Sequence, residues 1–199
     1  MKKILLSLIM CLWAVPVLAS DSAIDFLQNL SKDVIENGIE GTHSHSEREA
    51  FMRQRFTANL DLKSIGQFVL GAYWKKASDT EKQEFLSVFT ELLTKTWTDR
   101  FGLYNGQTVK FISSRPAQQK NQFYVESEIQ DKTPIALVWR VRSKNDTFLI
   151  IDISVEGVSM AMSYRSEYTT FLQQHQGRMA DLISELKTKV KNFKYSAKK

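Results

Sequence analysis

Between residues 107 and 156 the sequence alternates between apolar and polar side chains, and this alternation limits the possible folds more than any other feature. A period of two is typical of β-strands with one buried face, and it predicts strands near residues 107–114, 122–130, 134–143 and 147–156. The apolar residues of this region at odd-numbered positions are Val109, Phe111, Phe123, Val125, Ile129, Ile135, Leu137, Trp139, Val141, Leu149, Ile151, Ile153 and Val155. Short polar loops favour an antiparallel meander.

These thirteen side chains share one face only if every hairpin loop has an odd number of residues, because a slip of one residue turns a whole strand over. A three-residue loop at Lys144-Asn145-Asp146 meets this condition. It predicts that Val141 lies opposite Leu149, Trp139 opposite Ile151, and Leu137 opposite Ile153.

The sequence before and after the predicted strands has the apolar spacing of helices. The apolar stripe from Ile24 to Ile35 predicts a first helix that stops near Gly38 and Gly41. Capping boxes at Ser46-x-x-Glu49 and Ser78-x-x-Glu81 predict two further helix starts, with a short helix ending at Gly71 between them. Two helices separated by a break at Gly177 follow the sheet. The predicted class is α+β, a twisted four-stranded antiparallel sheet covered by N- and C-terminal helices.

The first residues are typical of a secretory signal. Lys2 and Lys3 precede an apolar run too short to span a bilayer, and Val17-Leu18-Ala19 predicts cleavage after Ala19. The prediction is therefore a signal peptide over 1–19, a periplasmic location, and one domain over 20–199. That domain divides into a helical part (20–102), a sheet (107–156), C-terminal helices (160–192) and a basic tail (193–199).

Composition argues against several kinds of function. Cys11 is the single cysteine and lies in the predicted signal, which excludes disulfides and thiol chemistry from residues 20–199. The formal net charge of +5 falls to +3 without Lys2 and Lys3, a balance too mild to indicate nucleic-acid binding. His43 and His45 lack a third metal ligand and are interpreted as loop residues. With no nucleophile motif either, the chain is predicted not to be an enzyme.

Asp152 and Glu156 fall on one face of a predicted strand, as a pair of catalytic carboxylates would. The preferred interpretation is that they balance Arg140 and Arg142 on the neighbouring strand.

Two separated segments carry a family resemblance. LGAYWKKASDTEKQEFLSVFTELL (Leu70 to Leu93) and DISVEGVSMAMSYRSEY (Asp152 to Tyr168) resemble the MlaC, or toluene-tolerance, family of periplasmic phospholipid-binding proteins. The resemblance implies an NTF2-like, cavity-forming arrangement and a carrier that shuttles phospholipid between the membranes. Its implied partners are an inner-membrane ABC transporter with an MCE-domain ring and an outer-membrane lipoprotein–porin complex. It implies no cofactor besides the phospholipid cargo, and the carrier is expected to be a monomer.

The apolar residues of the sheet and the adjoining helices are the predicted lipid contacts. They are Tyr73, Trp97, Phe101, Phe111, Val125, Leu137, Trp139, Ile151, Ile153, Met160, Met162 and Tyr164. Periodicity does not distinguish a lipid cavity from a filled core, so a periplasmic chaperone or interaction module with a filled core is the alternative. The lysines from Lys187 to Lys199 either keep the end of the last helix soluble or contact an acidic partner.

Overall fold

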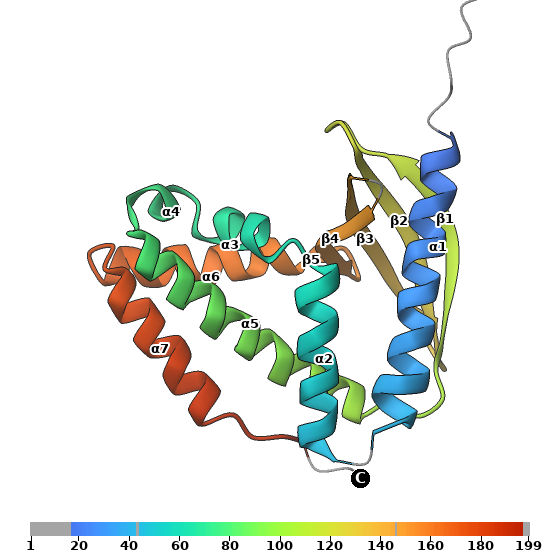
Figure 1. Cartoon of the computed structure of the whole chain (residues 1–199), viewed down its shortest axis with the longest axis horizontal. Coiled ribbons are helices and arrows are strands. Elements are labelled where there is room, and N and C mark those ends of the chain that lie inside the picture. The colour runs from blue at the N-terminus through green and yellow to red at the C-terminus, as the bar shows by residue number, and fades with distance from the viewer. Residues whose placement is uncertain (1–16, 43, 146, 197–199) are drawn as a thin grey trace, which may run out of the picture.

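The computed structural model describes residues 17–42, 44–145 and 147–196. Along the chain, one group of helices precedes the strands of the sheet and another follows them (Figure 1). In chain order the elements are α1 (Val17–Asp33), the π-helix η1 (Val34–Glu40), α2 (His45–Asn59), α3 (Leu62–Leu70), α4 (Ala72–Lys76), α5 (Asp79–Gly102), β1 (Thr108–Pro116), β2 (Gln122–Gln130), β3 (Ile135–Lys144), β4 (Thr147–Val155), β5 (Val158–Ser159), α6 (Met160–Gln174) and α7 (Met179–Lys191). The α+β class is confirmed. The short helix α4 and the two-residue strand β5 were not predicted.

The capping boxes decide where two of the long helices begin. Ser78 caps α5 as predicted: its Oγ accepts from the Glu81 amide at 3.2 Å, and the Glu81 carboxylate accepts from the Ser78 amide at 2.8 Å. The box predicted at Ser46 is wrong, because Ser44 and Glu47 form it instead. Glu49, the expected partner of Ser46, pairs with Lys95 on α5 at 2.9 Å. The helix therefore starts one residue before Ser46.

The sheet is an antiparallel meander in the order β1-β2-β3-β4-β5. Between β2 and β3 odd-numbered residues face odd-numbered residues, as predicted: Val125 pairs with Trp139, and Ser127 pairs with Leu137. The central pair of strands thus presents one apolar face.

The register predicted between β3 and β4 is wrong. Lys144 pairs directly with Thr147, so the turn is shorter than the predicted three-residue loop, of which Asp146 lies outside the described residues. A β-bulge then leaves Ile151 without a partner, and the observed pairs are Val141 with Ile150, Trp139 with Ile153, and Leu137 with Val155. The bulge restores the odd-to-odd pairing that the turn had broken.

A second bulge has the same effect on β1. Phe111 pairs with Ser127 but Ser113 pairs with Glu126, so Ile112 is extra and its side chain is 51% exposed. On the two sides of each bulge, therefore, residues of opposite parity point to the same face of the sheet. On β4, Phe148 and Ile150 therefore join the apolar face in place of Leu149 and Ile151.

Two hydrophobic cores fill the molecule. In the first, α3 to α7 pack around residues that include Phe85, Phe89, Tyr168, Leu172 and Leu182. In the second, α1 packs on one face of the sheet, here called the odd face, which is formed by odd-numbered residues of β2 and β3 together with Phe111 of β1 and Phe148 and Ile150 of β4. The buried residues of this core are Ala23, Leu27, Phe123, Val125, Val141 and Ile150. Leu60, at the end of α2, contacts both cores.

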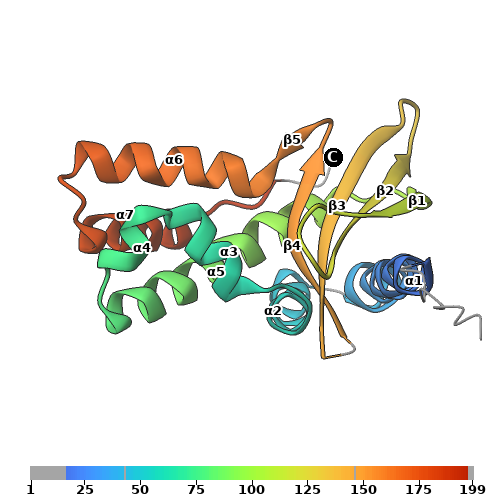
Figure 2. The same cartoon turned by 90° about the horizontal axis from the view of Figure 1, so that it is seen from above.

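The C-terminal helices cover less of the sheet than predicted. Figure 2 shows α1 on one side of the sheet and α6 starting on the other. Helix α6 touches β4 and β5 near its start and then runs along α3, while α7 packs on α5. Two of the C-terminal lysines pair with acids of neighbouring helices: Lys187 with Glu84 at 2.9 Å and Lys189 with Glu167 at 2.7 Å. Lys198 and Lys199 lie outside the described residues.

Candidate functional site

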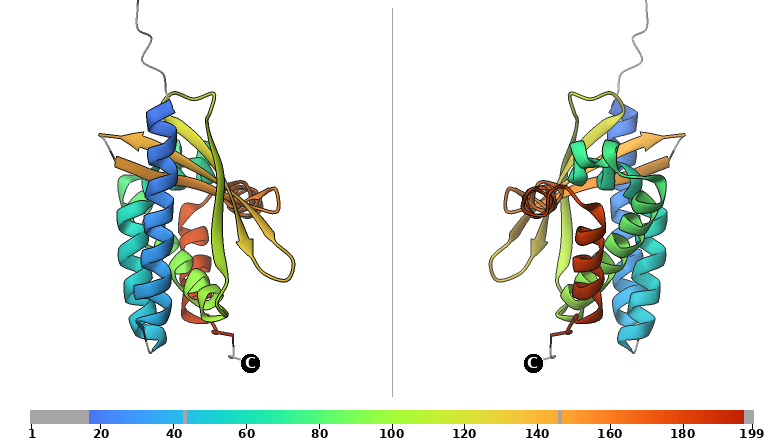
Figure 3. Two further views of the ribbon diagram at one scale, coloured as in Figure 1. Left: turned by 90° about the vertical axis from the view of Figure 1, so that its right-hand side faces the viewer. Right: turned by 90° about the vertical axis from the view of Figure 1, so that its left-hand side faces the viewer.

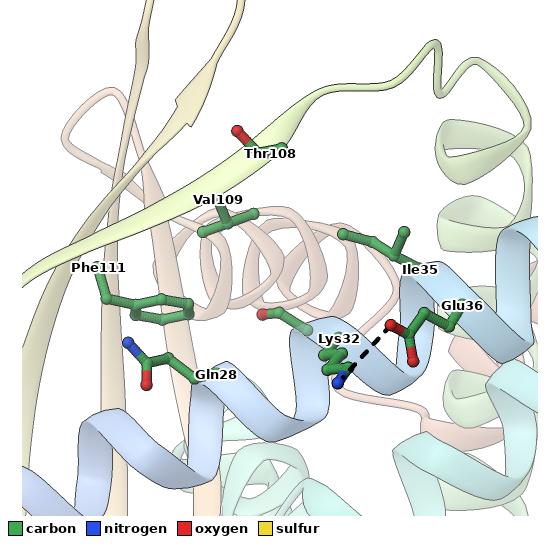
Figure 4. A pocket seen from close by; sticks show the side chains of 8 residues that line it. Gln28, Lys32, Ile35, Glu36, Thr108, Val109 and Phe111 are labelled. Atoms are coloured by element: carbon green, nitrogen blue, oxygen red, sulfur yellow. Dashed lines mark ion pairs between the residues drawn. The ribbon is translucent and has the colours of Figure 1, made fainter.

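A groove of about 290 Å³ runs between the α1–η1 segment and β1 (Figure 4). Its walls are Gln28, Ser31 and Lys32 from α1, Ile35 and Glu36 from η1, and Thr108, Val109 and Phe111 from β1. Val109 and Phe111 extend from the strand toward the helix, and Lys32 and Glu36 form an ion pair at 3.8 Å along the helix. Ile35, Val109 and Phe111 form an apolar strip beside five polar side chains, and such a strip suits the methylene groups of a ligand that also has a polar end.

Next to the groove lies the odd face of the sheet, and Phe111 belongs to both. Phe111 and Trp139 are half-buried there and pack with the fully buried Val125. The Trp139 indole donates from Nε1 to the Ser127 hydroxyl at 2.9 Å, and Ser127 is 1% exposed. This hydrogen bond fixes the plane of the largest side chain on the face.

The twelve predicted lipid contacts are distributed over both cores. Phe111, Val125 and Trp139 belong to the sheet–α1 core, whereas Tyr73, Trp97 and Tyr164 pack against the helical core. Phe101 lies 5.8 Å from Trp97, ring to ring. Leu137 is buried in β3, and Ile151, Ile153 and Met160 are half-buried. Met162 is 55% exposed and lies at the surface. The set does not line one continuous cavity.

Periodicity identified buried positions but not which stripes pack together, and this is why the set mixes two cores. Val109 and Ile35 were on predicted apolar stripes, so the sequence carried a signal for both groove walls. Gln28, Ser31 and Lys32 were missed because polar residues on an amphipathic helix are normally read as its solvent side.

The helical core is closed by an aromatic cluster. Phe85 and Phe89 stack at 5.5 Å, and Tyr168 meets both edge-on at 5.9 and 6.0 Å. Burial, followed by the nearby Tyr164 and Glu167, raises the pKa of Tyr168 far above its usual range. Its hydroxyl is buried without a hydrogen-bond partner. These rings pack against one another as the side chains of a protein core do.

A second pocket, of about 350 Å³, lies between α4 and the turn from α6 to α7. It is lined by Tyr73, Lys76, Gln173, Gln176 and Gly177. Its single aromatic side chain is Tyr73 and it has no aliphatic one, so it offers lipid tails fewer apolar side chains than the groove, which has Ile35, Val109 and Phe111.

The acidic residues singled out in the sequence accept hydrogen bonds from groups other than the predicted arginines. Asp152 accepts from the Ser159 hydroxyl at 2.6 Å and from the Ala161 amide at 3.0 Å, at the start of α6. Arg140 does lie opposite Asp152 in the β3–β4 ladder, as predicted, but its guanidinium donates to Gln119 and Gln122. Arg142 lies opposite Leu149 instead and forms an ion pair with Asp61, the N-cap residue of α3, at 2.8 Å. The Glu156 carboxylate accepts from the Ala136 amide.

Among the residues that the structure describes, no three His, Cys, Asp or Glu side chains gather closely enough to hold a metal ion. His45 stacks on Tyr195 at 4.4 Å, and His43 lies outside the described residues. Within the same ranges, no helix combines the length and apolar character that crossing a bilayer requires.

Three comparisons relate the chain to known proteins. The family model described as MlaC protein matches residues 27–188, which run from α1 to α7. A curated relative, the intermembrane phospholipid transport system binding protein MlaC of Haemophilus influenzae, is 24% identical over 144 residues, covering 67% of each protein. The phospholipid-binding protein from Ralstonia solanacearum, solved in complex with a phospholipid, superposes with a TM-score of 0.69 at 21% identity and covers 86% of this chain and 94% of its own. The two proteins share a fold.

Proposed function

Because this chain belongs to the MlaC family, we propose that it binds a phospholipid and carries it across the periplasm between the two membranes. The observation that best supports this proposal is the groove between α1 and β1, whose apolar side chains Ile35, Val109 and Phe111 lie beside the odd face of the sheet. The phospholipid bound to the Ralstonia protein of the same fold supports this choice of ligand.

Acyl chains are held by apolar contact alone, and in this groove the side chains for that contact come from η1 and β1. Val109 and Phe111 on β1 and Ile35 on η1 form the groove walls. The headgroup would lie at the rim among Gln28, Lys32 and Glu36, where both charges and hydrogen-bonding groups meet solvent. Such a rim suits a polar headgroup and requires no buried charge.

Energetics favour delivery by direct contact with a partner. Two chains of about sixteen carbons, at roughly 0.8 kcal/mol per methylene, nominally give near 25 kcal/mol, above the practical ceiling of about 18–21 kcal/mol for non-covalent binding. The actual affinity is lower, but release of the lipid into water would still be slow. The proposed partners are an inner-membrane ABC transporter with an MCE-domain ring and an outer-membrane lipoprotein–porin complex, each exchanging the lipid with the carrier by direct contact.

The test is to purify the protein from the periplasm without added lipid, extract it, and identify the extract by mass spectrometry. A near-stoichiometric phospholipid is expected. A matched pair of variants then locates it. Val109→Trp fills the groove and should lower the lipid recovered per mole, whereas Lys110→Trp places the same ring on the exposed side of β1 and should leave it unchanged. Equal lipid in both variants would remove the groove from the proposal.

The filled-core alternative has one observation in its favour. Val125, Val141 and Leu27 are fully buried in the sheet–α1 core, as expected of an interaction module that holds no ligand. That reading predicts wild-type protein free of lipid. It also predicts that Val125→Trp strains the fold by about 1–3 kcal/mol.

A further inference from the structure

Helix α1 is attached to the rest of the molecule in two chemically different ways. Toward the sheet its buried contacts are mainly apolar: Ala23 and Leu27 are fully buried there, and Phe26 stacks on Phe148 at 5.9 Å. The ion pairs that α1 makes among the described residues, Lys32 with Glu36 and Asp33 with Arg55, run to η1 and α2. Charged attachments therefore hold one end of the helix, and apolar contacts hold its length.

The end held by α2 is the π-helix. A π-helix is rare and usually one turn long, yet η1 spans Val34–Glu40. Gly38 lies so close to α2 that an added Cβ would sit 2.5 Å from the Phe51 ring. The buried Arg48 side chain donates to the Thr42 hydroxyl at 3.3 Å and to the Ile39 carbonyl at 3.5 Å. These contacts fix the C-terminal half of η1 to α2.

The other elements that surround the groove are held more firmly. Backbone hydrogen bonds join β1 to β2 and β2 to β3 along their lengths. The Arg142–Asp61 ion pair, at 2.8 Å, and the hydrogen bond from the Asp61 amide to the Ile150 carbonyl, at 3.0 Å, bind the sheet to the helical part. Figures 1 and 3 show α1 meeting α2 at the η1 end.

We propose that α1 is a lid over the odd face of the sheet, hinged at η1, and that phospholipid tails enter when it swings away from β1. The inference rests on the proposed lipid-binding function and adds the moving part. A groove of about 290 Å³ lies at the lower limit of the roughly 300–1,000 Å³ that ligand pockets span, so two acyl chains require the walls to separate.

In the open state, apolar contacts with the lipid replace apolar contacts with α1. When α1 leaves the sheet, Phe111 and Trp139 lose apolar contacts with the helix, and methylene groups of the lipid replace them. No ion pair to the sheet has to break among the described residues, since the ion pairs of α1 lie at the hinge side. Opening without a lipid would instead expose the same apolar face to water, which is unfavourable in proportion to the area exposed. The lid therefore opens at low cost only where acyl chains are present.

Thiol crosslinking tests the lid directly. In a Cys11→Ser background, Ser31→Cys on α1 and Thr108→Cys on β1 place one thiol on each wall of the groove, and a cleavable bis-maleimide joins them. Glu84→Cys with Lys187→Cys is the matched control, because these side chains meet at 2.9 Å between α5 and α7, away from the lid. The delipidated proteins are mixed with vesicles of phosphatidylethanolamine and phosphatidylglycerol that contain a fluorescent phospholipid.

The α1–β1 crosslink is expected to abolish lipid uptake, and cleavage of the linker should restore it, which also shows that the protein stayed folded. The α5–α7 crosslink should leave uptake at the uncrosslinked rate. Normal uptake with the α1–β1 crosslink overturns the lid while leaving lipid binding intact. Loss of uptake with both crosslinks assigns the motion to the helical part and also overturns it. If uncrosslinked protein takes up no lipid, the proposed function itself fails.

Discussion

Replacing Trp139 by phenylalanine removes one hydrogen bond from the apolar face and leaves its partner buried. Ser127 is 1% exposed, and its hydroxyl accepts from Trp139 Nε1 at 2.9 Å. A buried hydroxyl without a partner costs about 1–3 kcal/mol, and the smaller ring adds a loss of apolar contact. With a urea m-value of about 1–3 kcal/mol per molar, a loss near 2 kcal/mol lowers the unfolding midpoint by roughly 1 M.

A double-mutant cycle isolates the hydrogen bond. Once Trp139→Phe has removed the donor, changing Ser127 to alanine removes the orphaned hydroxyl and should cost little or even restore stability. The coupling energy between the two sites is expected at about 0.5–3 kcal/mol. Urea unfolding of the delipidated proteins, followed by far-ultraviolet circular dichroism, measures it.

The control is the pairing of Ser127→Ala with Val138→Ala, since Val138 lies on the opposite face of β3, where it faces Glu126 across the ladder. Those two changes should add within about 0.5 kcal/mol. If Trp139→Phe and Ser127→Ala are equally additive, the hydrogen bond does not stabilise this face, and the argument that it fixes the indole plane is refuted.

Three further outcomes follow from particular contacts. Leu137→Asp buries an unpaired charge and should cost more than about 4 kcal/mol, whereas Met162→Asp, at an exposed position, should change stability by less than about 0.5 kcal/mol; equal urea midpoints would contradict the face assignment. Asp152→Ala should destabilise by about 0.5–2 kcal/mol through the start of α6. Arg140 lies opposite Asp152 but donates to Gln119 and Gln122, so a cycle of Asp152→Ala with Arg140→Ala should show little coupling, whereas strong coupling would support the predicted ion pair. Burial acts to raise the pKa of Asp33, but hydrogen bonds from Arg55 and Asn37 outweigh it and hold that pKa below its usual value. Because the folded pKa is the lower one, the stabilisation is complete above the unfolded pKa of about 3.9 and is lost as the pH falls through the folded pKa; Arg55→Met should flatten this acid limb in unfolding experiments, and an unchanged limb would refute the linkage.

The helix starts show what local sequence can and cannot decide. Ser78-x-x-Glu81 has no competing frame nearby, and the predicted cap is the observed one. At the start of α2 two frames overlap, Ser44-x-x-Glu47 and Ser46-x-x-Glu49, and each satisfies the local rule. The choice between them depends on Lys95, which pairs with Glu49 from another helix. Only the tertiary contact resolves the ambiguity.

The bulges in the sheet were hidden for a related reason. In β4, Phe148, Leu149, Ile150 and Ile151 are consecutive apolar residues, so both alternation frames contain suitable side chains. The pattern therefore cannot reveal where the buried face changes from even to odd positions. The strands and the meander were predictable because they depend on the period, whereas the register depends on a tight turn and an unpaired residue. The groove walls were only half predictable, since the polar residues of α1 that face β1 carry no apolar signal.

The lid also bears on how a carrier can release so apolar a cargo. The nominal burial energy of two acyl chains, near 25 kcal/mol, exceeds what any reversible carrier can tolerate. In the proposed cycle the empty protein does not leave its apolar face in water, because Leu27 and Ala23 of α1 return to the sheet. The lipid therefore competes with the protein's own helix for the same surface, and its net affinity is lower by the free energy that closure recovers. A carrier with an internal competitor can retain lipid against water and still give it up to an apolar channel that meets the tails while the lid closes behind them.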